Sequence, residues 1–297
     1  MIKAITSNRI SNAILIKKKK IKKLILVEGS HDKLFFLKFK DENCSVELAY
    51  GWKNVIQVLD DLKAKHFENC IGVIDADLKK VIPEEFEMPD NIFMTDLHDI
   101  NIETIEHSFN VIYKSHCSED KNDVFTSYKK ITDLKNYIYE LSKPLSFLRI
   151  LSKRKNYHLS FKSKDETSNN IDYSKFINKE KFEFTSLKNL VETVINFSRS
   201  KTKNALPQNE ILLKELADLL ENERNKYEVT KITNGHDFGE IITLGLKKCL
   251  GSNQHIKADN ILRDCILNYE YSEFKKTNLY LSIRDTELKY GVAFLKN

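Results

Sequence analysis

The sequence is poor in the residues that interrupt regular structure. It has four prolines and eight glycines among 297 residues, and no low-complexity linker divides it. No run approaches the roughly 18–20 uninterrupted apolar residues of a membrane helix, and no signal-peptide pattern precedes a small-residue cleavage site. We therefore expect a soluble, cytoplasmic protein without membrane contacts, and its 41% of hydrophobic residues are enough to bury a sizeable core.

The cysteines and glycines exclude several classes of site. The five cysteines include no CxxC pair, and they are Cys44, Cys70, Cys117, Cys249 and Cys265. An odd, scattered set fits reduced thiols better than disulfides and argues against structural zinc. Neither a GxxxxGK[ST] loop nor a GxGxxG turn occurs, which argues against ATP binding by this chain and against a small-molecule phosphotransferase.

The excess of positive charge is small but unevenly spread. Lysine and arginine number 48 against 43 acidic residues, a formal net charge of +5. Positive charge is concentrated at residues 17–23 and 149–164, and the second segment also contains aromatic residues. Because cations pair with phosphates and aromatic rings stack on bases, we take Lys153, Arg154 and Lys155 as candidate nucleic-acid contacts. The alternative is that both segments are solvated surfaces.

Short apolar segments alternate with helical patterns in the first part of the chain. The predicted strands cover residues 23–29, 44–51, 69–77 and 91–99. Such alternation indicates an α/β fold, Rossmann-like, with a mainly parallel four-stranded sheet. Later segments carry apolar residues at helical spacing. The sequence therefore predicts an α/β domain at residues 1–118 and a mostly α-helical domain at residues 119–297 for substrate or partner contacts.

Acidic side chains end three of the four predicted strands. Glu28 ends the first, Asp75 and Asp77 end the third, and Asp99 ends the fourth. Parallel strands end at one edge of a sheet, so we expect these carboxylates to converge there. In a regular strand, Asp75 and Asp77 would point the same way and hold one or two hard cations. Each motif also has a plain alternative, because an aspartate after a strand often caps the next helix.

A carboxylate cluster of this kind indicates phosphoryl transfer. Mg²⁺, or Mn²⁺ in its place, accepts a few carboxylates, keeps several waters and bridges to phosphate. A pair of such ions stabilises both the attacking and the leaving oxygen of a phosphodiester displacement. We therefore expect a metal-dependent enzyme that acts on phosphodiesters.

The quoted motifs resemble those of a known family. "LVEGSHDKLFF" followed by "VIDADL" is similar to a TOPRIM domain, and the resemblance covers residues 22–117. It implies that Glu28 is a metal ligand and general base or acid, and that Asp75 and Asp77 bind Mg²⁺. Topoisomerases and primases usually continue with a third acidic residue where this chain has Leu78 and Lys79, so those two activities are not expected.

Small TOPRIM proteins of bacterial defence are more similar, in particular the nuclease subunit of PARIS anti-phage systems. The stretches "TDLHDIN" and "NGHDFGEIITLGLKK" support this comparison. It implies an endoribonuclease toxin, with tRNA as its target, that an ABC-type ATPase partner holds inactive until a phage protein triggers release. The alternatives are a standalone OLD-type DNA nuclease and a non-catalytic TOPRIM module that is regulatory or binds nucleic acid. A homodimer is compatible with each.

Further candidates lie at the end of the fourth predicted strand and just after it. Asp96, His98, Asp99 and Glu103 are suited to completing a metal shell or positioning an attacking water. The alternative for these residues is ordinary helix capping.

For two other acidic residues we expect capping. Asp32 follows Gly29 and is placed to cap the helix that begins there. Asp237, next to His236, is placed to cap a helix starting at Phe238. The other structural role expected for this pair is interdomain hydrogen bonding. His236 is retained as a site candidate.

Overall fold

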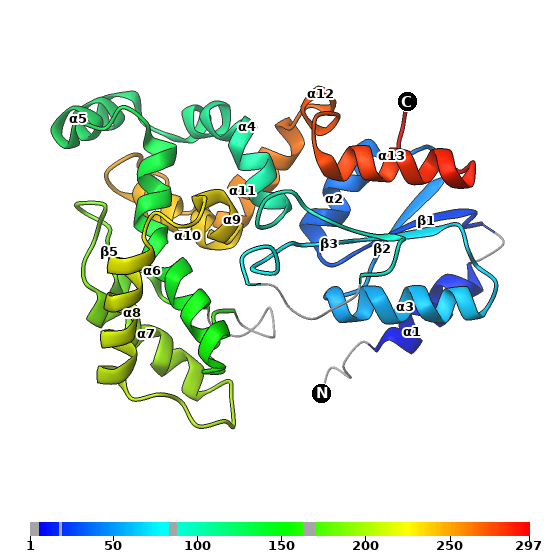
Figure 1. Ribbon diagram of the computed structural model, residues 1–297. Helices are drawn as coiled ribbons and strands as arrows, with labels where there is room; N and C mark the ends of the chain where they lie inside the picture. Colours follow the sequence, from blue (N-terminus) through cyan, green and yellow to red (C-terminus); the bar gives the residue numbers. More distant parts are fainter. Residues whose placement is uncertain (1–5, 18–19, 83–87, 163–169) are drawn as a thin grey trace. The chain divides into compact units, whose positions relative to one another are not determined.

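The computed structural model describes residues 6–17, 20–82, 88–162 and 170–297 (Figure 1). Their contacts define two compact units. The first comprises the described residues of 1–77, 84–108 and 262–297, and the second those of 78–83 and 109–261. The boundary expected at residues 118 and 119 differs from this division, because residues 262–297 pack with the first unit and the chain changes unit within helix α4 (Ile100–His116).

The first unit contains the predicted parallel sheet. Its strands are β1 (Lys23–Val27), β2 (Cys44–Leu48), β3 (Cys70–Ile74) and β4 (Ile92–Met94). They pair in the order β2-β1-β3-β4, and all pairs are parallel. The strands are shorter than predicted at their carboxyl ends, so the acidic residues lie just beyond the strands.

Two apolar cores cover the two faces of this sheet. Ile25 and Val27 belong to one core, and Leu24 and Leu26 to the other. All four side chains are fully buried. A strand buried on both faces needs apolar residues at every position, which explains the uninterrupted "LILV" run.

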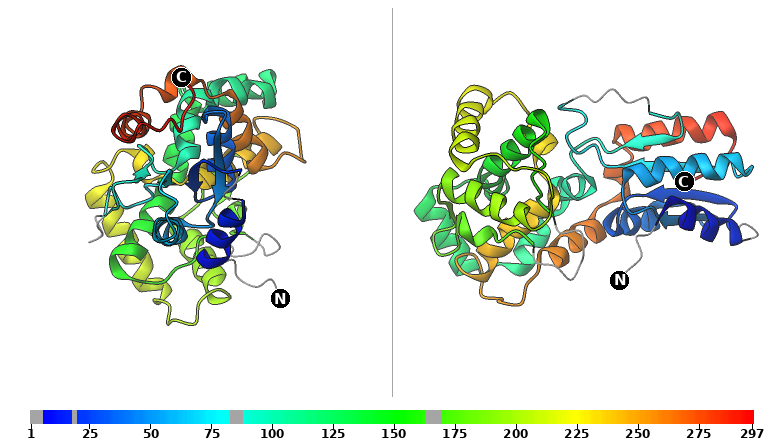
Figure 2. Two further views of the ribbon diagram at one scale, coloured as in Figure 1. Left: turned by 90° about the vertical axis from the view of Figure 1, so that its right-hand side faces the viewer. Right: turned by 90° about the horizontal axis from the view of Figure 1, so that it is seen from below.

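Different helices cover each face (Figure 1). Helices α2 (Ser30–Phe39), α12 (Tyr271–Phe274) and α13 (Asn278–Tyr290) supply one core. Helices α1 (Ser7–Ile16) and α3 (Trp52–Ala64) supply the other. Figure 2 shows the same unit from two further sides, with α13 in red beside the blue elements that surround the sheet.

Aromatic contacts bind the C-terminal segment to the sheet unit. The Phe35 ring lies 5.6 Å from that of Tyr269 and 5.0 Å from that of Phe274. Lys38 Nζ donates to the backbone oxygens of Leu267 and Tyr269 at 2.5 Å, at the end of helix α11 (Ala258–Asn268). A lysine there complements the unpaired carbonyls of the last helical turn.

The second unit is mostly helical, as predicted. Its helices are α5 (Glu119–Lys129), α6 (Leu134–Lys155), α7 (Leu187–Arg199), α8 (Asn209–Glu223), α9 (Val229–Ile232) and α10 (Gly235–Lys247). A two-stranded antiparallel ribbon of β5 (Ile177–Asn178) and β6 (Glu183–Phe184) accompanies them. Across the described part of the chain, no helix combines the length and apolar character needed to span a membrane.

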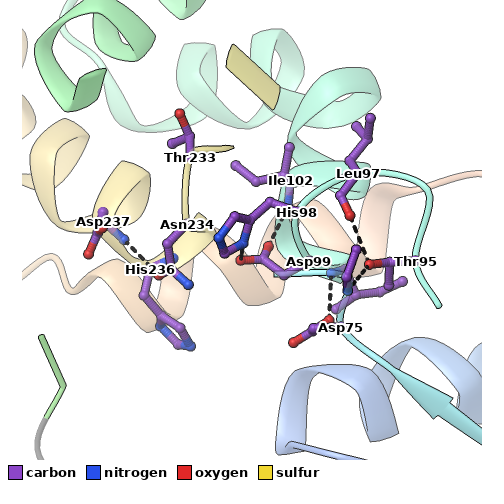
Figure 3. A network of polar contacts seen from close by, with 12 residues as sticks. Asp75, Thr95, Leu97, His98, Asp99, Ile102, Thr233, Asn234, His236 and Asp237 are labelled. Atoms are coloured by element: carbon purple, nitrogen blue, oxygen red, sulfur yellow. Dashed lines mark hydrogen bonds and ion pairs between the residues drawn. The ribbon is translucent and has the colours of Figure 1, made fainter. Parts of the chain in front are cut away.

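Asp237 has a structural role in this unit that differs from the predicted one. Helix α10 begins at Gly235, and Asn234 caps it by accepting the next backbone N–H groups (Figure 3). Asp237 instead accepts two hydrogen bonds of 2.8 Å from Arg149 and one of 2.6 Å from the Tyr173 hydroxyl. The prediction that Asp237 caps the helix was wrong. Its carboxylate is buried, and a buried carboxylate is stabilised by a cation and several hydrogen-bond donors, which Arg149 and Tyr173 supply here.

Gly72 provides a test of the packing between β3 and α3. A Cβ at this position would lie 2.6 Å from Val55 Cγ1 and 2.8 Å from Leu59 Cδ1. We expect Gly72→Ala to lower the free energy of unfolding by about 1–3 kcal/mol, because the core has no space for the methyl group. Urea unfolding measures the change. The exposed Ser282→Ala is the control and should change stability by less than about 0.5 kcal/mol; equal stability of both variants would contradict the packing.

Candidate functional site

Glu28 and Asp75 meet at the carboxyl edge of the sheet. Glu28 directly follows β1 and Asp75 directly follows β3, and these strands are neighbours. Glu28 Oε1 accepts the backbone N–H of Asp75 at 2.8 Å. The fold therefore brings together two carboxylates that are 47 residues apart in the sequence, as the parallel topology predicted.

Asp77 is held outside regular strand geometry. Its φ is +46°, in the left-handed region, and its N–H donates to the backbone oxygen of His98 at 2.7 Å. The expectation that Asp75 and Asp77 share a side of a regular strand is therefore wrong, because β3 ends at Ile74. The two aspartates instead lie on a turn whose shape depends on the segment after β4. A left-handed aspartate costs free energy, and such strain is concentrated at functional sites.

Five carboxylates act on one another at this edge. The pKa of Asp75 is raised well above its ordinary value, first by burial and then by the negative charges of Asp32, Asp99, Glu28 and Asp77. Like charges gathered in a poorly solvated place disfavour ionisation. The site thus concentrates negative charge that a bound cation would neutralise.

Asp32 belongs to this group, which the sequence interpretation missed. Its Oδ2 accepts the Gly29 N–H at 2.8 Å, so the predicted capping role is confirmed. Burial, and next the charge of Glu28, raise the pKa of Asp32 to about 7. The signal in the sequence was its proximity, since Asp32 lies four residues after Glu28, in the first turn of the helix that follows the strand.

The Thr95 side chain fixes the turn that carries the aspartates (Figure 3). Its hydroxyl accepts the Ala76 N–H at 3.0 Å and donates to the Leu97 backbone oxygen at 2.9 Å. Thr95 is 1% exposed, so water does not replace these bonds. The end of β4 therefore shapes the Asp75–Asp77 turn through one hydroxyl group.

His98 and Asp99 form a buried pair beside the aspartates. His98 Nδ1 and Asp99 Oδ2 lie 3.1 Å apart, and Asp99 Oδ1 accepts the Ile102 N–H at 2.9 Å (Figure 3). The capping role of Asp99 is thereby observed. Its charge also acts on Asp75, whose Oδ1 accepts the Ile100 N–H at 3.3 Å. Asp99 thus contributes both to the start of helix α4 and to the electrostatics of the site.

Asp96 and Glu103 anchor backbone groups of the same unit. Asp96 Oδ2 accepts the Asn278 N–H at 2.6 Å, at the start of α13. Glu103 Oε1 accepts the Leu97 N–H at 2.7 Å. These contacts support the elements around the site.

The remaining candidates lie in the second unit. The His236 N–H donates to Asn234 Oδ1, as part of the α10 cap. Arg154 makes two hydrogen bonds of 2.9 Å to Glu223, and Lys155 pairs with Glu215 at 3.5 Å. Lys153 is on the same last turn of α6, and residues 163–164 of the basic segment lie outside the described residues. Arg154 and Lys155 therefore have acidic partners within the chain.

The donor chemistry at the sheet edge fits Mg²⁺. Within the described ranges, no three histidine, cysteine, aspartate or glutamate side chains are arranged so that they could hold one metal ion. The carboxylates nevertheless supply only hard oxygen donors, the kind that Mg²⁺ prefers. Their mutual repulsion, expressed in the raised pKa values of Asp75 and Asp32, would be relieved by a divalent cation.

Comparison with known proteins does not assign the chain to a family. No protein-family model matches the chain, and no curated protein matches it. The class of protein is therefore defined by its fold and its site: an α/β sheet of four parallel strands with clustered carboxylates at the strand ends, and a mostly helical remainder.

Asp32→Asn tests the electrostatics through the pH dependence of stability without divalent metal. The pKa of Asp32 is about 7 in the folded protein against an ordinary 3.8, so the folded state retains a proton that the unfolded state releases. The contribution of Asp32 to wild-type stability should therefore fall as pH rises from about 4 to about 7. Asparagine does not ionise and still accepts from Gly29.

We expect Asp32→Asn to match wild type at pH 4 and to exceed it at pH 7.5 by roughly 1–4 kcal/mol in urea unfolding. The exposed Asp285→Asn is the control and should show no such pH-dependent gain. A gain for Asp32→Asn that is the same at both pH values would refute the electrostatic account.

Thr95→Val tests the turn. Valine preserves the shape but leaves the Ala76 N–H and the Leu97 carbonyl oxygen without the hydroxyl, so we expect a loss of about 1–3 kcal/mol in unfolding free energy. Thr95→Ser keeps the hydroxyl and should recover most of that loss. If serine is destabilising and valine is not, the methyl group and not the hydroxyl fixes the turn.

Proposed function

We propose that this chain is a divalent-metal-dependent TOPRIM nuclease that hydrolyses phosphodiester bonds. The observation that carries the proposal is the hydrogen-bonded meeting of Glu28 and Asp75 at the ends of adjacent parallel strands, within a group of carboxylates that repel one another. Clustering carboxylates away from water lowers the stability of a fold, and such clusters with perturbed pKa values are typical of functional sites.

Glu28, Asp75 and Asp77 are the residues that would hold Mg²⁺ or Mn²⁺. When bound, the metal supplies Lewis-acid stabilisation of charge on the phosphoryl oxygens. The contact between Glu28 Oε1 and the Asp75 N–H fixes the orientation of the glutamate, which is the proposed general base or acid. Asp99 orients His98 next to the same turn.

The finer assignment depends on the resemblance of "LVEGSHDKLFF" and "VIDADL" to small TOPRIM defence proteins. On that basis we propose a tRNA-cleaving endoribonuclease toxin of an anti-phage system similar to PARIS, held inactive by an ABC-type ATPase partner. A free nuclease with a preformed site would be toxic, which is a physical reason to expect a restraining partner. The competing functions are an OLD-type DNA nuclease and a non-catalytic TOPRIM module.

Single substitutions of the three proposed ligands test the activity. Glu28→Gln, Asp75→Asn and Asp77→Asn should each lower metal-dependent cleavage by at least about 100-fold, because each removes a charged ligand. The assay follows end-labelled tRNA and duplex DNA on gels, with Mg²⁺ or with a chelator. Asp285→Asn is the matched control and should cleave as wild type does.

Unfolding curves of the same variants separate a lost site from a lost fold. Asp75→Asn should be no less stable than wild type without metal, since asparagine is neutral among the surrounding carboxylates without having to hold a proton. Full cleavage by any of the three variants would refute the proposed site. Cleavage of DNA alone would favour the OLD-type function, and no metal-dependent cleavage of either substrate by wild type would favour the non-catalytic module.

A further inference from the structure

A lysine-lined groove runs beside the edge strand β2, in the first unit. Its volume is about 450 Å³. The wall consists of residues before β1, along α2, between α2 and β2, and within β2. The charged lining residues are four lysines and two glutamates: Lys20, Lys22, Lys33, Lys40, Glu42 and Glu47. The groove thus includes part of the lysine run that the site does not use; Lys18 and Lys19 lie outside the described residues.

The positive charge of the groove exceeds what its own glutamates neutralise. Glu47 is already paired with Lys17 at 3.2 Å and with Lys33 at 3.5 Å. Lys40 directs its ammonium group toward the backbone oxygens of Asp41 and Glu42, which are not charged. Lys20 and Lys22 are exposed. An anionic polymer is the ligand that complements such a lining.

The groove follows the sheet toward the carboxylates. Five residues of β2 at ~3.3 Å each extend about 16 Å, a length that accommodates several phosphates of a nucleic-acid strand. Val27 pairs with Leu48 in the register of β1 and β2, and the Ala49 N–H donates to Val27 O at 2.8 Å. The far end of β2 therefore lies beside the strand end that carries Glu28.

An exposed aromatic residue stands at that end of β2. Tyr50 is 57% exposed and has a φ of +59°, a left-handed conformation that is uncommon for a bulky side chain. Asn54 Nδ2 supports this turn by donating to the backbone oxygens of Ala49 at 2.8 Å and Tyr50 at 3.4 Å. A strained turn that presents an aromatic ring to solvent fits base stacking.

We propose that this groove binds the phosphate backbone of the nucleic acid, with Lys20, Lys22 and Lys40 as phosphate contacts and Tyr50 stacking on a base near Glu28. The proposal rests on the proposed nuclease function for the identity of the polymer. An added protein strand is the competing occupant of a sheet edge, but the lysines that flank this edge, from the segment before β1 and from α2 and its end, complement an anionic ligand better than a neutral backbone. The exposed tyrosine and the direction of the groove favour nucleic acid.

The double variant Lys20→Glu/Lys22→Glu tests the groove by binding alone. Fluorescence anisotropy with a labelled single-stranded RNA, in chelator so that no cleavage occurs, gives the affinity at several salt concentrations. We expect the affinity to fall at least about tenfold and the slope of log K against log salt to decrease by about 1.4, or 0.7 for each lost phosphate contact. Tyr50→Ala should weaken binding by about fivefold or more without changing that slope.

The matched control is Lys63→Glu/Lys289→Glu, which makes the same charge change at two exposed lysines of the same unit outside the groove. If the control weakens RNA binding as much as the groove variant does, the effect is one of net charge and the proposal is overturned. Lys20→Gln/Lys22→Gln, a milder change, should give a smaller loss in the same direction if the groove variant folds poorly.

Two further outcomes distinguish the groove from the active site. If the groove variant binds RNA as wild type does but loses self-association in sedimentation, the edge is a protein interface and the nucleic-acid proposal fails. If wild type cleaves no nucleic acid, the proposed function fails, whereas a salt-dependent loss of RNA binding by Lys20→Glu/Lys22→Glu still supports the groove.

Discussion

The gathering of carboxylates at the end of a buried parallel sheet is the constraint on which the candidate site depends. Apolar strands exclude water from the sheet, so Asp75 and Asp32 at its edge lose hydration and meet other negative charges. The protein compensates with backbone donors: Glu28 accepts from Asp75, Asp32 from Gly29, and Asp99 from Ile102. These bonds orient the carboxylates but add no positive charge, so a bound cation would stabilise the group further.

The segment after β4 supplies the second part of this arrangement. Thr95 and the backbone oxygen of His98 hold the turn between Asp75 and Asp77, and Glu103 holds Leu97 in turn. The turn lies beyond strand β3, so the left-handed conformation of Asp77 is stabilised by contacts with the segment after β4 and not by the hydrogen bonds of the sheet. The aspartates are thereby placed by contacts from a segment about 20 residues away in the chain, since Ala76 and Thr95 are 19 apart.

In the first unit, negative and positive side chains gather at different parts of the sheet. Acids collect where β1 and β3 end, while lysines line the edge strand β2. Acids at the strand ends and lysines along the neighbouring sheet edge suit a polyanion whose backbone is held by the lysines and whose scissile phosphate needs a metal. This distribution of charge supports nucleic-acid binding by the first unit better than the net charge or the basic segment at the end of α6 does.

Hydrophobic periodicity, together with the rule that parallel strands end at one edge of a sheet, was enough to predict the alternation of strands and helices, the parallel sheet, and the meeting of Glu28 and Asp75. The sequence interpretation left Asp32 as a cap only, gave Asp237 the wrong role, and assigned residues 262–297 to the helical domain. These three points depend on packing between distant segments. Burial, the approach of Arg149 to Asp237 and the packing of Phe274 on Phe35 join residues distant in sequence, and no local pattern records such contacts.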